Sequence, residues 1–263
     1  MKHIGKSYDK VDAKGILSGK PSYTGDFVPK DALIIKVLRS PHAQAKIKSI
    51  DTSKAKLIPG VEAIFTYEDV PNTRFTLAGQ TYPEPSAYDA LILDSVVRYV
   101  GDEVALVVAK DEATALKAMP LIKVEYEVQK PVLDLRTAMD HETVVHPEDD
   151  ILNHIPVGQD YKRNICVSYH KRVGDIEGEL AKCDYVVEGT YFDQATRQSA
   201  MEPFQSFGYI DHLGRIVIVS STQIVFHVRR HIARALGIPA SKIRVIKPRI
   251  GGGFGSKQTA CTE

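Results

Sequence analysis

The sequence predicts an α+β fold, because strand-like and short helical segments are mixed along the chain without an internal repeat. Hydrophobic residues make up 43% of the 263 residues and charged residues 25%, which is typical of globular proteins. This composition excludes a disordered tail, a collagen-like fibre and a disulfide-dense miniprotein.

The first half of the chain carries most of the expected elements. Residues 32–39 form an apolar run that predicts a strand buried at its centre, and residues 45–51 alternate as a half-buried strand does. A short helix is expected at 52–57, where a hydroxyl residue can cap its start and Pro59-Gly60 stops it. The remaining elements are a strand at 61–66, a hairpin of strands 96–100 and 103–108, a helix at 111–119 and a strand at 122–128.

The second half predicts more strands and one longer helix. The expected strands are residues 185–192, 207–211, 215–220 and 243–246, with a turn at His212-Leu213-Gly214 joining the middle two. A helix is expected from Gln223 to Leu236, and Gly237 ends it as a C-cap. Its apolar residues fall on one face, at i, i+3, i+7 and i+11: Val225, Val228, Ile232 and Leu236.

These elements divide the chain into four parts. Residues 1–17 are polar and predict an N-terminal arm, and residues 18–130 form the α+β domain. Residues 131–160 contain three prolines and an acidic run, which indicates a surface linker. Residues 161–263 form the second unit.

Charge and composition exclude several partners. The formal net charge is +1, which gives no general attraction to nucleic acid or to a membrane surface. No apolar run approaches the roughly 18 residues that span a bilayer, and the N-terminus has no apolar signal segment, so we expect a cytoplasmic protein. Cys166, Cys183 and Cys261 form no C-x-x-C pair, so we expect reduced, mostly buried thiols and no zinc or iron–sulfur ligation within this chain.

A glycine cluster, Gly251-Gly252-Gly253-Phe254-Gly255, follows the last expected strand. Four glycines in five residues indicate positive φ angles or close approach of the backbone to another group. The spacing matches neither a P-loop nor a dinucleotide fingerprint. The cluster is consistent with a ligand-binding loop or a structural turn, and we expect it to be mobile without a ligand.

Two other positions allow more than one interpretation. Glu202 precedes a proline, and it can be an acid/base group or, more ordinarily, an acceptor for backbone N–H groups. His227 and His231 have the i, i+4 spacing of zinc ligands, but they stand beside Arg229 and Arg230 without the glutamate of H-E-x-x-H. We therefore expect a solvated basic helix face there.

An ordered series of short motifs runs through both halves. The first half carries Ser40-Pro41-His42-Ala43, Pro59-Gly60-Val61 and residues 97–105 and 124–127; the second carries Ser221-Thr222-Gln223, Leu236-Gly237-Ile238-Pro239, Ile243-Arg244-Val245 and residues 251–257. Over nearly the whole chain, this series resembles the molybdenum-binding subunit of the xanthine dehydrogenase and aldehyde oxidase family. The resemblance implies an a/b hammerhead domain at 18–130 and the first, truncated part of a molybdopterin-binding domain at 161–263.

The resemblance implies the N-terminal portion of a molybdopterin-dependent hydroxylase, which adds a water-derived oxygen to an electron-poor carbon. It favours a xanthine or purine dehydrogenase, and the alternatives within the family are an aldehyde oxidoreductase or another N-heterocycle hydroxylase. The implied cofactor is molybdenum–molybdopterin, shared with a downstream molybdopterin-binding segment. Further implied partners are an iron–sulfur subunit with [2Fe–2S] clusters and an FAD subunit.

By motif position, the resemblance also implies site residues. The cofactor-binding residues would be Gln223, Gly252, Gly253, Phe254 and Gly255. Gln223 and Phe254 would be indirect molybdenum contacts, and Gln258 would face the substrate, where its neutral amide can donate to and accept from a purine edge.

The length departs from the family pattern, because the family's general base and most of its cofactor contacts lie further downstream. No residue of this chain is therefore expected to be catalytic, and the isolated chain is expected to be inactive. A different class of function stays open: a non-catalytic hammerhead module that acts in assembly, or a truncated remnant.

Overall fold

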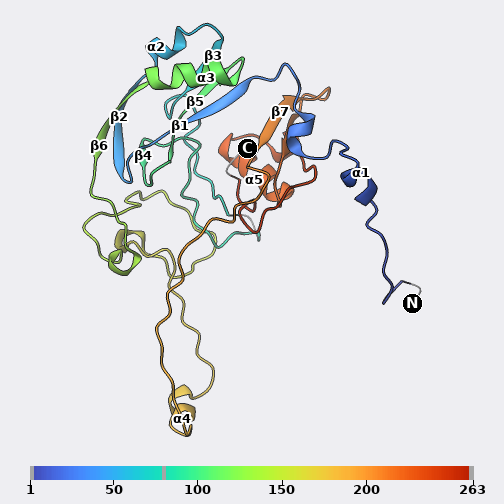
Figure 1. Cartoon of the computed structure of the whole chain (residues 1–263). Helices are drawn as coiled ribbons and strands as arrows, with labels where there is room; N and C mark the ends of the chain where they lie inside the picture. Colours follow the sequence, from blue (N-terminus) through green and yellow to red (C-terminus); the bar gives the residue numbers. More distant parts are fainter. Residues whose placement is uncertain (1–2, 79–80, 261–263) are drawn as a thin grey trace.

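The computed structural model describes residues 3–78 and 81–260, so Met1 and Lys2 of the expected arm and Cys261 lie outside the described residues. Figure 1 shows two lobes built on β-sheets and a long arm that carries a short helix at its tip. Mixed sheets and helices confirm the predicted α+β class. Within the described ranges, no helix is long and apolar enough to cross a membrane.

The first lobe contains two three-stranded sheets, ordered β1-β5-β3 and β4-β2-β6, and the neighbouring strands in both are antiparallel. Its elements are β1 (Ile34–Arg39), β2 (Ala45–Asp51), α2 (Ser53–Lys56), β3 (Val61–Phe65), β4 (Val96–Val97), β5 (Glu103–Ala109), α3 (Glu112–Ala118) and β6 (Lys123–Val128). Strand β5 lies at the centre of the core. Ala105 and Val107 belong to the apolar cluster that includes residues of α3, and Val104 belongs to a second cluster with Ala45 and Val97 of the other sheet.

The second lobe is a single sheet, ordered β7-β8-β9, with one helix against it. Its elements are β7 (Ser206–Ile210), β8 (Ile216–Ser220), α5 (Val225–Ala235) and β9 (Ile243–Ile246). Strands β7 and β8 are antiparallel, which confirms the predicted hairpin, and β9 is parallel to β8 because α5 provides the crossover between them.

Outside the sheets, the short elements are α1 (Ala13–Leu17), η1 (Thr24–Phe27), η2 (Met119–Leu121), η3 (Leu135–Thr137), η4 (Tyr161–Arg163), α4 (Ile176–Leu180) and η5 (Ala240–Lys242).

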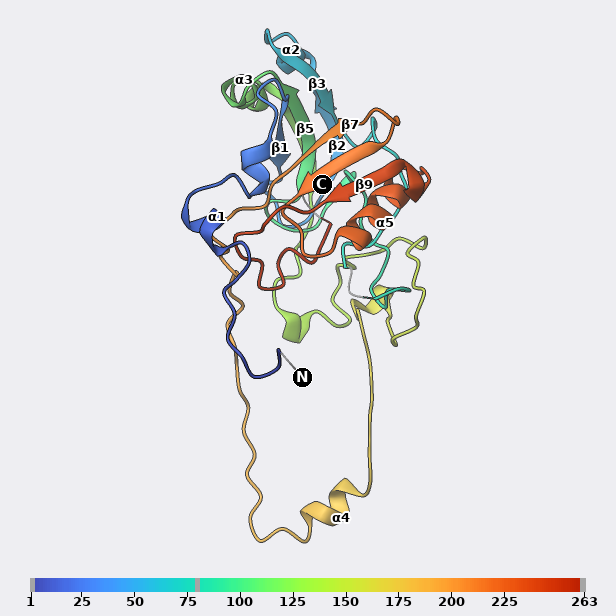
Figure 2. The same cartoon turned by 90° about the vertical axis from the view of Figure 1, so that its right-hand side faces the viewer.

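The backbone N–H of Arg249, after β9, donates to the carbonyl of Ser22 at 2.9 Å. The N-terminal segment therefore runs beside the second lobe, as Figure 2 also shows.

The hairpin predicted at 96–108 is wrong. Strand β4 pairs with β2, whereas β5 pairs with β1 and β3, so the two strands lie in different sheets. The turn between them is bound to Ser40, whose N–H donates to Asp102 O and whose carbonyl accepts from Gly101 N–H, both at 2.8 Å. Ser40 follows β1, and these two bonds attach the turn to it while the flanking strands diverge.

The strand predicted at 185–192 is also not formed. This segment is part of an arm, residues 168–200, that leaves the lobes, turns at α4 and returns in extended conformation (Figures 1 and 2). Two more expectations need correction: Cys166 and Cys183 are both exposed, and Leu236 at the end of the predicted apolar helix face is 38% exposed.

Candidate functional site

The glycine cluster after β9 forms a loop packed against neighbouring segments. A Cβ atom at Gly251 would lie 2.6 Å from the Cβ of Glu202, and one at Gly253 would lie 2.5 Å from Oε1 of Gln223. A side chain at Gly251 would clash with Glu202, and one at Gly253 would displace the Gln223 carboxamide, so these two glycines permit the close approach that the sequence predicts.

Glu202 and Lys257 form a buried ion pair that anchors this loop. Lys257 Nζ donates to Glu202 Oε2 at 2.9 Å and to the Glu202 carbonyl at 3.0 Å. The same carboxylate accepts from Gly251 N–H at 2.7 Å and from Gln205 Nε2 at 3.0 Å. The side chains are 7% and 1% exposed for Glu202 and Lys257, so the contact is shielded from water. The expectation of a mobile loop did not include this ion pair. The pair fixes both ends of the glycine loop, at Gly251 and at Lys257.

The electrostatics of Glu202 suit an anchor. Burial by itself raises the pKa of this carboxyl, but the hydrogen bonds from Gly251, Lys257 and Gln205 outweigh burial and leave the pKa lowered. Glu202 is therefore ionised at neutral pH, with its acceptor positions in use. Of the two interpretations open from the sequence, the geometry favours the structural acceptor.

Gln223 lies between β8 and α5, directly beside the loop. Its backbone N–H donates to the carbonyl of Lys257 at 2.8 Å, so the loop and the start of α5 are held together. Its side-chain Oε1 is buried and has no hydrogen-bond partner among the described residues. An unpaired buried polar atom costs about 1–3 kcal/mol. A bound group with a donor at this point would remove that cost, and the carboxamide beside Gly253 thus fits a polar cofactor.

The other residues predicted for the site occupy the outer part of the loop. The Phe254 side chain is 73% exposed, and its φ of 50° is in the left-handed region. Ser256 N–H donates to Gly253 O at 2.8 Å, and Gln258 N–H donates to Gly255 O at 3.2 Å, which closes the turn. The structure thus brings Gln223 against Gly253 and places Phe254 and Gly255 at the surface, with Gln258 half-buried.

The basic face of α5 is not fully solvated, contrary to the sequence-based expectation. His231 is 2% exposed, and its Nε2 lies 3.3 Å from Oε1 of Glu84 in the first lobe. Arg230 also pairs with Glu84. Burial lowers the pKa of His231 more than Glu84 raises it, so the imidazole is neutral at neutral pH. The face is covered because a carboxylate from the other lobe is buried against it.

Glu84, like Lys257, is a buried charged residue whose role sequence reasoning missed. It is 1% exposed and accepts from the Tyr88 hydroxyl at 2.8 Å as well as from Arg230. Burial raises its pKa, but the hydrogen bonds from Arg230, Tyr88 and His231 outweigh it and lower the pKa to about 2. Only its position between Pro83 and Pro85 marks Glu84 in the sequence, and that pattern predicts no partner on α5.

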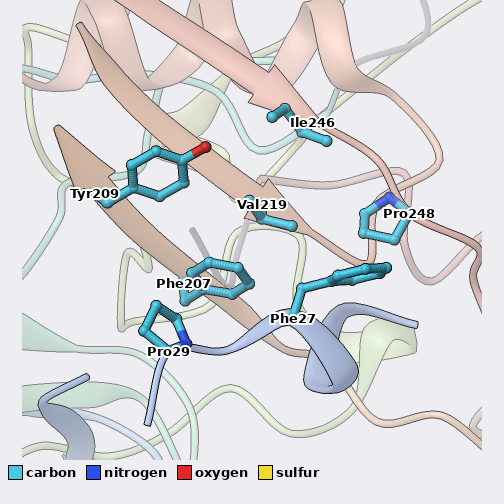
Figure 3. A pocket seen from close by; sticks show the side chains of 7 residues that line it. All are labelled: Phe27, Pro29, Phe207, Tyr209, Val219, Ile246 and Pro248. Atoms are coloured by element: carbon cyan, nitrogen blue, oxygen red, sulfur yellow. The ribbon is translucent and has the colours of Figure 1, made fainter. Parts of the chain in front are cut away.

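An apolar cavity of about 470 Å³ lies on the second lobe, which also carries the glycine loop (Figure 3). Its lining residues come from the sheet and from the N-terminal segment: Phe27, Pro29, Phe207, Tyr209, Val219, Ile246 and Pro248. None of the residues predicted for the cofactor site lines this cavity, and its lining has no charged group. It is therefore separate from the glycine loop.

Comparison with known proteins identifies the chain. Residues 18–130 match the family model of the aldehyde oxidase and xanthine dehydrogenase a/b hammerhead domain. Residues 157–263 match that of the molybdopterin cofactor-binding domain. The chain thus belongs to the aldehyde oxidase and xanthine dehydrogenase family of molybdopterin proteins.

Individual relatives are considerably longer. The chain is 40% identical to the probable hypoxanthine oxidase XdhD of Escherichia coli K12, over 99% of this chain and 30% of the relative. It is 31% identical to the nicotinate dehydrogenase large molybdopterin subunit of Eubacterium barkeri, over 97% of this chain and 55% of the relative. The crystal structure of quinoline 2-oxidoreductase from Pseudomonas putida 86 superposes with a TM-score of 0.77 at 28% identity, covering 96% of this chain and 31% of that one. The chain thus spans less than a third of the length of the probable hypoxanthine oxidase and of the quinoline 2-oxidoreductase chain.

Breaking the buried ion pair should destabilise the chain strongly. Glu202→Gln leaves the Lys257 ammonium buried without its carboxylate, so we expect a loss of about 3–5 kcal/mol in the free energy of unfolding, measured in urea. The control is Glu179→Gln, which breaks the exposed Lys182–Glu179 pair and should cost less than about 1 kcal/mol. Equal losses for the two variants would show that the Glu202–Lys257 pair does not anchor the loop.

Glu84 should make the stability depend on pH. Its pKa in the folded chain, about 2, is below the ordinary value of 4.5, so its contribution is present above pH 4.5 and disappears as the pH falls toward 2. We expect Glu84→Gln to be less stable than the wild type at pH 7, with the difference shrinking as the pH falls from 4.5 toward 2. Unfolding at a series of pH values measures this, with the exposed Glu127→Gln as control. A difference that stays constant with pH argues against the ion pair.

Proposed function

We propose that this chain is the N-terminal portion of the molybdopterin subunit of a purine hydroxylase. In this proposal residues 18–130 are the hammerhead domain and residues 161–263 contribute to the cofactor site. Residues 131–160 link these two parts, and residues 1–17 form a separate N-terminal arm. The single observation that carries the proposal is the buried, unpartnered Gln223 oxygen beside the backbone of Gly253.

Molybdopterin, when bound, would supply the redox chemistry that transfers a water-derived oxygen to an electron-poor carbon. The residues of this chain would position it. Gln223 has an amide that can donate or accept, and the glycine loop presents backbone groups without side chains in the way. Since Glu202 and Lys257 satisfy each other, neither is available as a general base, which supports the view that the base is supplied from outside this chain.

The purine assignment rests on similarity to the probable hypoxanthine oxidase. The nicotinate dehydrogenase relative supports a nitrogen heterocycle more generally. In either case Gln258 would contact the ring edge, and [2Fe–2S] and FAD subunits would receive the electrons. The remaining molybdopterin-binding polypeptide would complete the site.

Cofactor capture tests the proposal directly. The chain would be purified alone and with the polypeptide that follows the matched region in a molybdopterin subunit, and bound molybdenum and pterin would be measured. We expect both in the complex at near-stoichiometric amounts. Their absence from a complex that does form would overturn the proposal in favour of a non-catalytic assembly module.

In the active complex, Gln223→Ala and Gln258→Ala should behave differently. Loss of a hydrogen bond in a desolvated site costs about 1–3 kcal/mol, so we expect Gln223→Ala to lower kcat/KM roughly tenfold to a hundredfold on every substrate. Gln258→Ala should change the ranking among purines, because its partner would be the ring. Gln129→Ala, in the first lobe, is the control and should match the wild type. Equal losses on all purines for Gln258→Ala would exclude the purine-reading role.

A further inference from the structure

The returning limb of the arm has no backbone–backbone pairing. No backbone–backbone hydrogen bond involves residues 184–200 among the described parts of the chain. The limb is extended and projects away from both lobes in two perpendicular views (Figures 1 and 2). Backbone N–H and C=O groups in folded proteins are almost always paired, and a row of free groups in an extended segment is a template for another strand.

The side chains of this limb have the pattern of a half-buried strand. In an extended segment alternate residues share a face, so Tyr185, Val187 and Tyr191 lie on the same side. These three are 91%, 91% and 92% exposed. Soluble proteins rarely expose adjoining large apolar side chains unless they form an interaction site. The strand predicted from the sequence is not formed, but its alternating apolar pattern lies exposed in the extended limb.

The arm also lacks internal support. Tyr169 and Val173 on the outgoing limb are each 77% exposed, so neither limb buries its apolar residues against the other. Even a paired two-stranded hairpin is only marginally stable in water, and the two limbs of this arm contain no paired strands.

The position of the limb indicates which chain pairs with it. Two residues after it stands Glu202, whose N–H donates to Gly251 O at 3.1 Å and whose carboxylate accepts from Gly251 N–H. A polypeptide paired along the limb is therefore directed toward the glycine loop. The limb also carries Asp184, Glu188 and Asp193, which disfavour a phosphate backbone or an anionic membrane.

We propose that residues 185–192 are a docking strand for the polypeptide that follows the matched region in the longer molybdopterin subunits. This inference rests on the proposed function, and it identifies the surface through which the cofactor site is completed. Main-chain hydrogen bonds to the docking strand provide affinity, and the face formed by Tyr185, Val187 and Tyr191 provides the apolar contact. A second copy of this chain would instead bring another glycine loop and leave each site incomplete.

The test uses the polypeptide that follows the matched region of the E. coli K12 relative as the probe. It is mixed with the full chain, and both binding and amide exchange of residues 185–192 are measured. We expect exchange in the docking strand to slow at least tenfold in the complex. We expect Val187→Pro, which removes a strand N–H, to weaken binding by about tenfold. Because the backbone of Val187 makes no backbone–backbone hydrogen bond in the described chain, this variant should keep the melting temperature of the wild type.

The matched control is Leu133→Pro, at a residue that is 80% exposed outside the arm, and it should bind as the wild type does. The inference is overturned if the probe does not bind, if the docking strand exchanges equally fast in the complex, or if self-association already protects it in the isolated chain. A complex with a protected docking strand but no molybdenum or pterin contradicts only the proposed function. A cofactor-loaded complex with an unprotected docking strand contradicts only the inference.

Discussion

The buried ion pair between Glu202 and Lys257 holds together the part of the molecule on which the candidate site depends. Burying two charges is costly, and the contact persists only when the remaining hydrogen-bond positions are filled. Here Gly251 N–H, Gln205 and the Glu202 carbonyl fill them. The pair joins the chain just after the arm of residues 168–200 to the end of the glycine loop. A loop so rich in glycine would otherwise lose much conformational entropy on ordering.

The orientation of Gln223 depends on both lobes. Its backbone is bound to Lys257, and α5 begins two residues later. That helix is in turn held by Glu84 through Arg230 and His231. A buried carboxylate from the first lobe therefore sets the position of the helix that begins two residues after Gln223. The hammerhead domain thus positions part of the candidate site without contributing a residue to it.

Local patterns predicted most of the fold and little of its long-range pairing. Strands β1, β2, β3 and β6 and helices α3 and α5 follow from apolar periodicity and from end signals, which are local properties. The hairpin at 96–108 failed because Ser40, about sixty residues earlier in the chain, binds the turn. Glu84 and Lys257 were missed because a buried charge is recognised by its partner, and the partners are 146 and 55 residues away. The approach of Gln223 to Gly253 was anticipated only through family resemblance, since nothing in the spacing alone joins them.

The central claim is that the ion pair orders the glycine loop before any cofactor binds. Residue-resolved amide exchange of the isolated chain tests it most directly. The N–H groups of Gly251 and Gln223 are bonded to Glu202 and Lys257, whereas those of residues 185–192 have no backbone acceptor in the described chain. We expect the first two to exchange at least roughly a hundredfold more slowly than the N–H groups of residues 185–192, after correction for intrinsic rates. Equally fast exchange at Gly251, Gln223 and residues 185–192 would show that the loop is unordered without cofactor, and would contradict the account.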